Sequence, residues 1–177
     1  MKVLLHSCCG PCASACVPRL KAGGHTVAMF FSNSNIDTRE EYERRLGEAR
    51  KLAAAEGVPL VADAYDHADW LRAVAAGYEQ EPERGRRCER CYRYNLSRTA
   101  GYAAAHGFEA FTTSLTVSPH KPSAKIFAAS EDPRFLREDF KKKEGFKLSV
   151  KRAAELGLYR QAYCGCEFSR RGVEGNA

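Results

Sequence analysis

Seven of the eight cysteines in this chain fall into three tight groups. The groups are Cys8-Cys9-x-x-Cys12, Cys88-x-x-Cys91 and Cys164-x-Cys166. Each lies among glycine, proline or charged residues, where the chain turns and side chains can converge on one point. Thiolates at such spacings can reach a common metal centre, as they do in zinc sites and iron–sulfur clusters. The sequence therefore predicts a metalloprotein, and an enzyme in particular.

The grouped cysteines divide naturally into four and three. Four thiolates complete a cubane iron–sulfur cluster or a closed zinc site, whereas three leave a metal with an open coordination position for chemistry. We assign a 4Fe–4S cluster to Cys88, Cys91, Cys164 and Cys166. The second metal ion, iron or zinc, is assigned to Cys8, Cys9 and Cys12. This division is a hypothesis, in which a ligand is free to cross between the two sets.

Cys16 differs from the other seven cysteines. It lies one helical turn beyond Cys12, next to Val17. We expect it to be a small buried apolar residue rather than a ligand, as unpaired cysteines often are.

The composition narrows the class of protein. A length of 177 residues fits one domain, residues 1–177, with a substantial core. No apolar run approaches the roughly 20 residues that span a bilayer, and the N-terminus lacks a signal-peptide pattern. We therefore expect a cytoplasmic protein without membrane contact, whose reduced thiols favour metal or redox chemistry over disulfides. The net charge of +6 suits a polyanion such as nucleic acid, although many proteins carry as much.

Apolar runs of strand length alternate with helical patterns along the chain. The predicted strands are 2–6, 26–32, 58–65 and 108–114, and the predicted helices are 13–22, 38–57, 69–76, 88–106, 123–130 and 149–156. This alternation predicts an α/β fold with a parallel, Rossmann-like (HUP-like) sheet and helices on both faces. Because sites form at the carboxyl ends of such strands, we expect the metal-binding loops there.

Several motifs resemble those of a known family. They are Leu5-His6-Ser7-Cys8-Cys9-Gly10-Pro11-Cys12, Phe30-Phe31-Ser32-Asn33-Ser34-Asn35-Ile36, Glu40-Glu41-Tyr42-Glu43-Arg44-Arg45-Leu46, Arg87-Cys88-Glu89-Arg90-Cys91-Tyr92, the segment 111–121 ending in Ser118-Pro119-His120-Lys121, Asp139-Phe140-Lys141-Lys142-Lys143, and the segment 157–166. In this order the motifs are highly specific, and the chain resembles the QueH type of epoxyqueuosine reductase almost end to end. Two positions depart from the family pattern: Ser34 stands where proline is more usual, and Cys16 is not part of it.

The resemblance implies the last step of queuosine synthesis. Epoxyqueuosine, at the wobble position of certain tRNA anticodons, loses its epoxide oxygen to give the cyclopentene of queuosine. The family is understood to use a 4Fe–4S cluster with a nearby further metal, and no cobalamin. An external electron donor is then required, because the reaction consumes two electrons.

The reaction also consumes two protons and therefore needs a proton donor. His120 is the first candidate, because histidine titrates near neutrality. The alternative for His120 is a loop histidine that only hydrogen-bonds the backbone. Tyr163 and His6 are weaker candidates, and His6, at the end of a buried strand, is better suited to packing.

A tRNA substrate requires phosphate contacts and stacking surfaces. The basic residues next to the cysteine motifs are the candidates for phosphate binding, namely Lys141, Lys142, Lys143, Arg86, Arg87 and Arg90, with Arg84 and Arg160 nearby. Tyr92, Tyr94 and Tyr159 either offer stacking faces or belong to the core. Asn33 and Asn35, after the second strand, are candidates for reading the modified base.

Two other functions stay open at this point. One is an iron–sulfur tRNA-thiolating enzyme on a similar fold, but such an enzyme needs a phosphate cradle after the first strand. The Cys-Cys-Gly-Pro-Cys turn disfavours that cradle, because a proline and three thiols stand where free backbone N–H groups are needed. The other is a non-enzymatic, zinc-stabilised RNA-binding module.

Overall fold

A computed structural model describes residues 1–174 of the chain, and it is built on a four-stranded sheet. The strands are β1 (Lys2–His6), β2 (Thr26–Phe31), β3 (Leu60–Ala62) and β4 (Ala110–Thr113). Their order is β3-β2-β1-β4, and every neighbouring pair is parallel. The prediction of a parallel, Rossmann-like α/β fold is confirmed.

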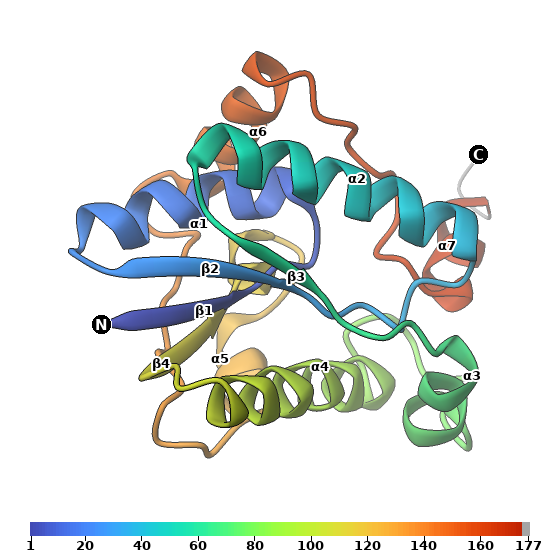
Figure 1. The fold of residues 1–177 in the computed structure, drawn as a ribbon. Coiled ribbons are helices and arrows are strands. Elements are labelled where there is room, and N and C mark those ends of the chain that lie inside the picture. Colours follow the sequence, from blue (N-terminus) through green and yellow to red (C-terminus); the bar gives the residue numbers. More distant parts are fainter. Residues whose placement is uncertain (175–177) are drawn as a thin grey trace.

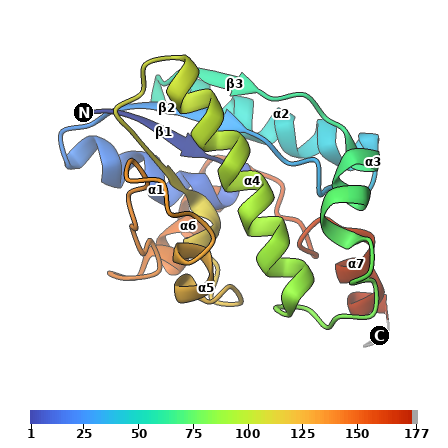
Figure 2. The same ribbon diagram turned by 90° about the horizontal axis from the view of Figure 1, so that it is seen from below.

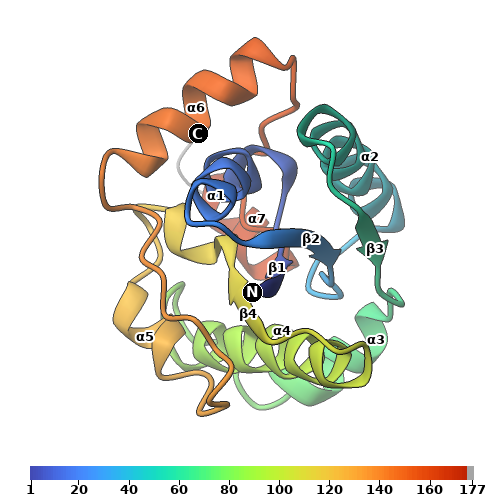
Figure 3. The ribbon, with the colours of Figure 1, turned by 60° about the vertical axis from the view of Figure 1, so that its left-hand side comes forward.

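Helices cover both faces of the sheet (Figure 1). One face carries α1 (Gly10–Ala22) and α2 (Arg39–Glu56), with α6 (Gly145–Glu155) packed against α1. The other face carries α4 (Arg86–Ala105), which crosses it in Figure 2, and the short α5 (Ser123–Phe127). Figure 3 separates these layers, with the strands between them.

Strand β1 carries three consecutive apolar residues, because both of its faces are covered. Val3 and Leu5 pack on the α1 and α2 side, whereas Leu4 packs on the α4 side, and all three are fully buried. Such continuous apolar runs are typical of parallel strands buried on both faces. The two cores hold the strands so that all their carboxyl ends meet at one end of the sheet.

Short elements gather beyond those carboxyl ends. They are α3 (His67–Trp70), the π-helical turn η1 (Leu71–Ala75), the 3-10 turn η2 (Ser114–Val117) and α7 (Glu167–Glu174). Figure 1 shows α3 and α7 at the end of the molecule opposite the N-terminus. Trp70, Val74, Ala75 and Cys166 form a small apolar cluster there, which joins the third cysteine group to α3 and η1.

The observed elements differ from the predicted ones mainly at their ends. The first helix begins at Gly10 rather than residue 13, because Cys9 caps it and Pro11 fits its first turn. Strand β3 spans only Leu60–Ala62, because it is an edge strand that pairs with β2 alone. The helix predicted at 149–156 begins at Gly145, and α7 was not predicted. None of the described helices combines the length and apolar character needed to cross a membrane.

Candidate active site

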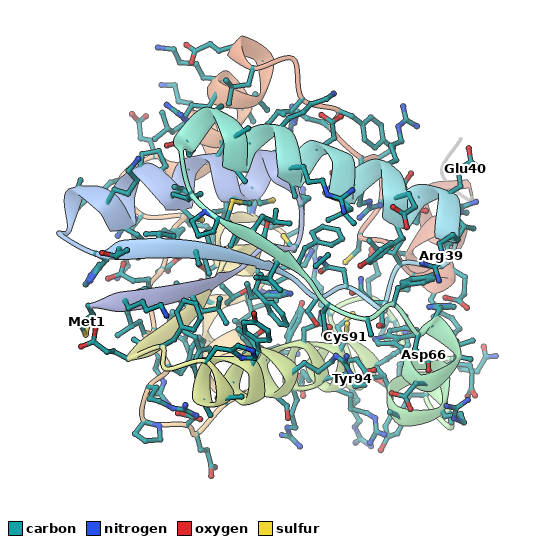
Figure 4. The ribbon with its side chains drawn as sticks, viewed as in Figure 1. Met1, Arg39, Glu40, Asp66, Cys91 and Tyr94 are labelled. Atoms are coloured by element: carbon teal, nitrogen blue, oxygen red, sulfur yellow. The ribbon has the colours of Figure 1, made fainter. Side chains whose placement is uncertain are left out.

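A cavity of about 510 Å³ lies beyond the carboxyl ends of β1, β2 and β4. Its wall includes all seven grouped cysteines: Cys8, Cys9, Cys12, Cys88, Cys91, Cys164 and Cys166. Figure 4 labels Cys91 on α4, at the end of the molecule that also carries α3 and α7. Three segments far apart in the sequence thus bring their thiols to one cavity.

The first cysteine group is compact enough to bind one ion. The sulfur atoms of Cys8, Cys9 and Cys12 lie within 4.8 Å of one another. Among the residues that the structure describes, no other group of three histidine, cysteine or carboxylate side chains is close enough to share an ion. Three convergent thiols suit a thiophilic metal such as iron or zinc.

Cys9 is the thiol of this group that most readily becomes a thiolate. It caps α1, and its sulfur accepts the Cys12 backbone N–H at 3.4 Å. Hydrogen bonds from the thiols of Cys12 and Cys8 hold the pKa of Cys9 well below its usual value, although burial opposes them. The positive end of the helix also favours a negative charge at this position. The first turn of α1 therefore prepares one anionic ligand before a metal binds.

The position of this turn is fixed by a close approach of two helices. A Cβ atom on Gly10 would lie 2.9 Å from the Glu48 carbonyl oxygen of α2, so a glycine is required there. On the other side, the Ser114 hydroxyl accepts the Cys8 N–H at 3.0 Å and donates to the Cys8 sulfur at 3.2 Å. Residues of α2 and of the segment after β4 thus hold the first cysteine group.

The second and third cysteine groups are spaced more widely than the first. Cys88 and Cys91 lie on the first turns of α4, and Cys164 and Cys166 precede α7. In the described part of the chain, no three of these four sulfurs are close enough to share one ion. A single zinc ion bound at about 2.3 Å would need sulfurs about 3.8 Å apart. Each thiolate of a cubane cluster binds a different iron, so the wider arrangement suits a 4Fe–4S cluster.

Cys91 and Cys166 differ from Cys9. Burial raises the pKa of Cys166 to about 11 and that of Cys91 well above its usual value. Without a bound cation both therefore remain protonated at neutral pH, and a metal must displace their protons. The Cys88 sulfur accepts the N–H of Arg84 at 3.2 Å, and Arg84 has a left-handed φ of 67°. A non-glycine residue seldom adopts this conformation, which here directs the N–H at the sulfur.

Helix α2 supports the third cysteine group through one arginine. Arg45 is almost fully buried and pairs with Glu41 at 2.7 Å. It also donates hydrogen bonds to the carbonyl oxygens of Cys164, at 2.8 Å, and Tyr163, at 3.2 Å. Gly165 follows with a φ of 141°, and its carbonyl accepts the N–H of Asp37 at 2.9 Å. The loop that carries Cys164 and Cys166 is thereby attached to α2 and to the end of the segment that precedes it.

The three candidate proton donors have different surroundings. His120 is exposed at the cavity wall, and its Nδ1 lies 3.4 Å from the Arg84 guanidinium. Tyr163 also lines the cavity, but its hydroxyl donates to Asp37 at 2.8 Å and burial raises its pKa. His6 lies outside the cavity wall and is fully buried, and burial lowers its pKa to about 4. His6 is therefore a neutral core residue, as its place in a buried strand indicates.

The basic residues predicted to bind phosphate separate into two sets. Arg87 donates to the carbonyl oxygens of residues 78, 79 and 81, Arg90 to those of residues 73 and 74, and Lys141 to those of residues 116 and 121 and to the Ser123 hydroxyl. These three cations hold loops together. Arg86, Lys142 and Lys143 are instead exposed and available to a ligand. Their exposure could not be read from charge alone.

The candidates for base contacts also separate. Asn33 and Asn35 are buried in the cavity wall, and Asn33 donates to the Ser7 carbonyl at 2.9 Å. Tyr92 is buried among core residues, and Tyr94 bonds Asp69 through its hydroxyl. Tyr159 stacks with the Arg44 guanidinium, 3.6 Å above its ring. Tyr92 belongs to the cavity wall but is only 4% exposed, and Tyr94 and Tyr159 are not among the described wall residues.

Lys121 also lines the cavity, although it was not among the residues predicted for the site. Its ammonium makes no hydrogen bond or ion pair with the part of the chain that the structure describes. The nearby charge of Cys164 raises its pKa above the usual value, against the effect of burial and with further help from Cys8. Lys121 is the only lysine among the described residues of the cavity wall. Its position in the sequence, next to His120 and after the fourth strand, could have identified Lys121 as a residue of the site.

Comparison with known proteins agrees with the motifs. The family model described as Epoxyqueuosine reductase QueH matches residues 3–172, a range that includes every cysteine. This chain belongs to the QueH family. The resemblance predicted from the sequence is confirmed.

Individual QueH relatives match along nearly the whole chain. The Epoxyqueuosine reductase QueH of Streptococcus pyogenes serotype M1 is 34% identical, over 96% of this chain and 70% of the relative. That of Dehalococcoides mccartyi is 34% identical, over 95% of this chain and 92% of the relative. That of Acinetobacter baylyi is 35% identical, over 96% and 81%. The similarity therefore extends over both the sheet and the cysteine-bearing loops.

Proposed function

We propose that this chain is an epoxyqueuosine reductase, an oxidoreductase that converts epoxyqueuosine in tRNA to queuosine. The observation that carries the proposal is the match of the QueH family model to residues 3–172, together with seven thiols around one cavity. A cavity of about 510 Å³ lies within the range of ligand pockets and suits a modified nucleoside. Because the substrate is tRNA, we infer that the protein acts in the cytoplasm.

We further propose how the thiols are divided. A 4Fe–4S cluster is held by Cys88, Cys91, Cys164 and Cys166, and a mononuclear metal, iron or zinc, by Cys8, Cys9 and Cys12. This division is supported by the compactness of Cys8, Cys9 and Cys12 and by the wider spacing of the four proposed cluster ligands. When bound, the cluster would pass on electrons from an external donor, and the mononuclear metal would act as a Lewis acid.

The residues of the chain then orient the substrate and supply protons. Loss of the epoxide oxygen forms a carbon–carbon double bond and water, and consumes two electrons and two protons. Arginine only donates hydrogen bonds, so the Arg84 guanidinium beside His120 Nδ1 makes that nitrogen an acceptor and leaves the proton on Nε2. We propose that His120 Nε2–H hydrogen-bonds the departing oxygen at the cavity wall and that His120 donates a proton to it from the imidazolium form, in which Nδ1 is also protonated and no longer accepts from Arg84. Tyr163, whose hydroxyl already donates to Asp37, is the weaker candidate.

Polar groups in the wall and outside it complete the site. Buried Asn33 and Asn35 offer amide groups to the edge of the modified base. Exposed Arg86, Lys142 and Lys143 provide charge for the anticodon-loop phosphates.

The decisive experiment is an anaerobic assay. The reconstituted protein is incubated with tRNA that bears epoxyqueuosine, with dithionite as reductant, and the nucleosides are analysed by mass. We expect queuosine, lighter than the substrate nucleoside by one oxygen atom, and no product from a Cys88→Ala variant. A protein with a full cluster that forms no queuosine would contradict the proposal. Formation of a thiolated nucleoside would favour the thiolating enzyme, and RNA binding by a colourless zinc protein would favour the binding module.

A further inference from the structure

An exposed aromatic side chain lies at the cavity and has no role in the site described so far. Among the described residues, only Met1, Phe146 and Leu148 are large hydrophobic side chains with substantial exposure. Phe146 is 38% exposed and belongs to the cavity wall, whereas Leu148 is 42% exposed and does not. Single exposed apolar side chains are common, but an exposed ring in the wall of a cavity is placed where a bound molecule can contact it.

The backbone before Phe146 fixes the place of this ring. Lys143 and Glu144 both have a φ of 58°, in the left-handed region, so the chain makes a tight turn into α6. A Cβ atom on the following residue, Gly145, would collide with the Phe140 carbonyl oxygen, so only glycine fits. Phe140 itself is buried in the core. The turn is therefore anchored, and Phe146 begins a helix at a defined position.

The next turn of α6 is also held against the site. Ser149 lies in the cavity wall, and its carbonyl oxygen accepts the Ser14 hydroxyl of α1 at 3.4 Å. Helices α1 and α6 pack along their lengths, side by side in Figure 3. Phe146 thus lies on α6, which packs against α1, the helix that begins at the first cysteine group.

Lysines flank Phe146 in the sequence. Lys142 and Lys143 are exposed, and their ammonium groups have no hydrogen bond or ion pair within the described chain. Lys147 pairs only with the exposed Glu144, at 3.2 Å, where such a pair contributes little. An aromatic face among free cations matches a single-stranded nucleic acid, whose bases stack while its phosphates meet the lysines.

We propose that Phe146 stacks on a nucleobase of the tRNA anticodon loop that neighbours the modified nucleotide, while Lys142 and Lys143 contact the adjoining phosphates. This inference rests on the proposed function for its substrate class, tRNA. The reacting carbons must enter the cavity to reach the cysteines, so the neighbouring nucleotides stay at its opening, where Phe146 lies. Phe146 is a binding residue in this proposal and takes no part in the chemistry.

The test uses fluorescence of an introduced tryptophan. The chain has one tryptophan, Trp70, which is almost fully buried but belongs to the cavity wall, so its own response is measured on the parent protein and subtracted. We expect the emission of a Phe146→Trp variant to be quenched, saturably, by a synthetic anticodon stem–loop of the substrate tRNA. The matched control is Leu148→Trp, on the same helix and equally exposed but outside the cavity wall, and its emission should barely change. Equal quenching of both variants would overturn the proposal.

Affinity measurements give a second readout. Stacking on an aromatic side chain contributes about 1–3 kcal/mol per base, so Phe146→Ala should weaken stem–loop binding roughly tenfold. Phe146→Leu should restore part of the loss, and Leu148→Ala should bind like the parent. Thermal unfolding of each variant identifies a loss of binding that comes from misfolding. Unchanged affinity in a folded Phe146→Ala variant would refute stacking.

The outcomes separate this proposal from the proposed function. Binding of the stem–loop requires no reduction, so specific quenching without queuosine formation would refute the reductase and leave the stacking intact. Queuosine formation with unchanged binding in Phe146→Ala would refute the stacking alone.

Discussion

Two cysteines on one helix show how position decides the chemistry of a thiol. Cys9 caps α1 and accepts hydrogen bonds that lower its pKa. Cys16 lies further along the same helix, fully buried, and donates to the Cys12 carbonyl at 3.4 Å. Burial raises the pKa of Cys16 well above its usual value. The expectation that Cys16 is a buried packing residue is confirmed, and it provides a control for its neighbours.

The first prediction uses this pair. A Cys9→Ser variant should lose the mononuclear metal and keep the iron and sulfide of the cluster, because its thiolate belongs only to the first group. Cys16→Ala should retain both centres. Metal and sulfide analysis after anaerobic reconstitution measures the outcome. Loss of cluster sulfide in Cys9→Ser would show that the two sets of ligands are not separate.

Lys121 is the subject of the second prediction. Lys121 shares the cavity wall with the cysteines, so Lys121→Met would leave the negative charge of metal-bound thiolates there uncompensated. We expect the reduction potential of the cluster to fall and the turnover rate to drop about tenfold or more, as for loss of a preorganised charged group. Lys121→Arg keeps the charge and should keep the potential. Potentials come from redox titration followed by electron paramagnetic resonance, and equal potentials in the Met and Arg variants would contradict this role.

At the residue level, the sequence predicted which cysteines lie together better than it predicted the hydrogen-bond partners of charged side chains. Close spacing in the chain was sufficient to select the seven cysteines that meet in one cavity. Sequence position was not sufficient for Lys141 and Arg87. Both were predicted to bind phosphate, but their charged groups donate hydrogen bonds to backbone carbonyl oxygens. The partner of a long flexible side chain depends on segments that only folding brings near.

At the level of elements, the site depends on contacts between α2 and the third cysteine group. Arg45 provides those contacts from a buried position, through its ion pair with Glu41 and its bonds to Cys164 and Tyr163. The bonds to Cys164 and Tyr163 were invisible in the sequence, because they join residues more than a hundred positions apart. It explains how a loop with an exposed cysteine keeps one conformation.

The third prediction follows from this contact. Arg45→Met should destabilise the fold by about 3–5 kcal/mol, because it leaves the Glu41 carboxylate buried without its partner. The cluster should also dissociate faster, since the loop of Cys164 loses two hydrogen bonds. The matched control is Arg50→Met, on the same helix but exposed, which should change neither property. Chemical denaturation and decay of the cluster absorbance measure them, and a stable cluster in Arg45→Met would contradict the argument.

The elements that the sequence predicted well are those with a local cause. The apolar run of β1 and the capping Thr38 of α2 mark their elements directly, and the structure contains both. Helix α7 was missed because it is short and polar, and its contacts are tertiary. Phe168 lies under the Arg87 guanidinium, and Ser169 bonds both Cys164 and Glu83. Such a helix forms on the surface that the rest of the site provides.

For the whole molecule, the parallel sheet explains why distant cysteines meet. All four strands point the same way, so the segments that follow them lie at one end, with α3 and α7 beyond (Figure 1). The sequence predicted this arrangement from the alternation of strands and helices. It did not predict the distribution of the +6 charge, because basic residues used inside the fold count the same as exposed ones.

The last prediction tests that distribution through salt. If Lys142 and Lys143 each meet a phosphate of a single-stranded loop, changing both to glutamine should reduce the slope of log affinity against log salt by about 1.4. The Lys21→Gln control removes an exposed lysine that bonds Glu56, at the far end of α1, and should leave the slope unchanged.

Lys141 gives an independent control beside the same pair. Its ammonium already makes three hydrogen bonds within the protein, so Lys141→Gln should lower the melting temperature without changing the slope. Stem–loop affinities measured across a salt series decide between these expectations. A slope that falls equally for Lys141→Gln and for the double variant would mean that phosphate draws Lys141 out of its internal bonds, and that bound tRNA rearranges this turn.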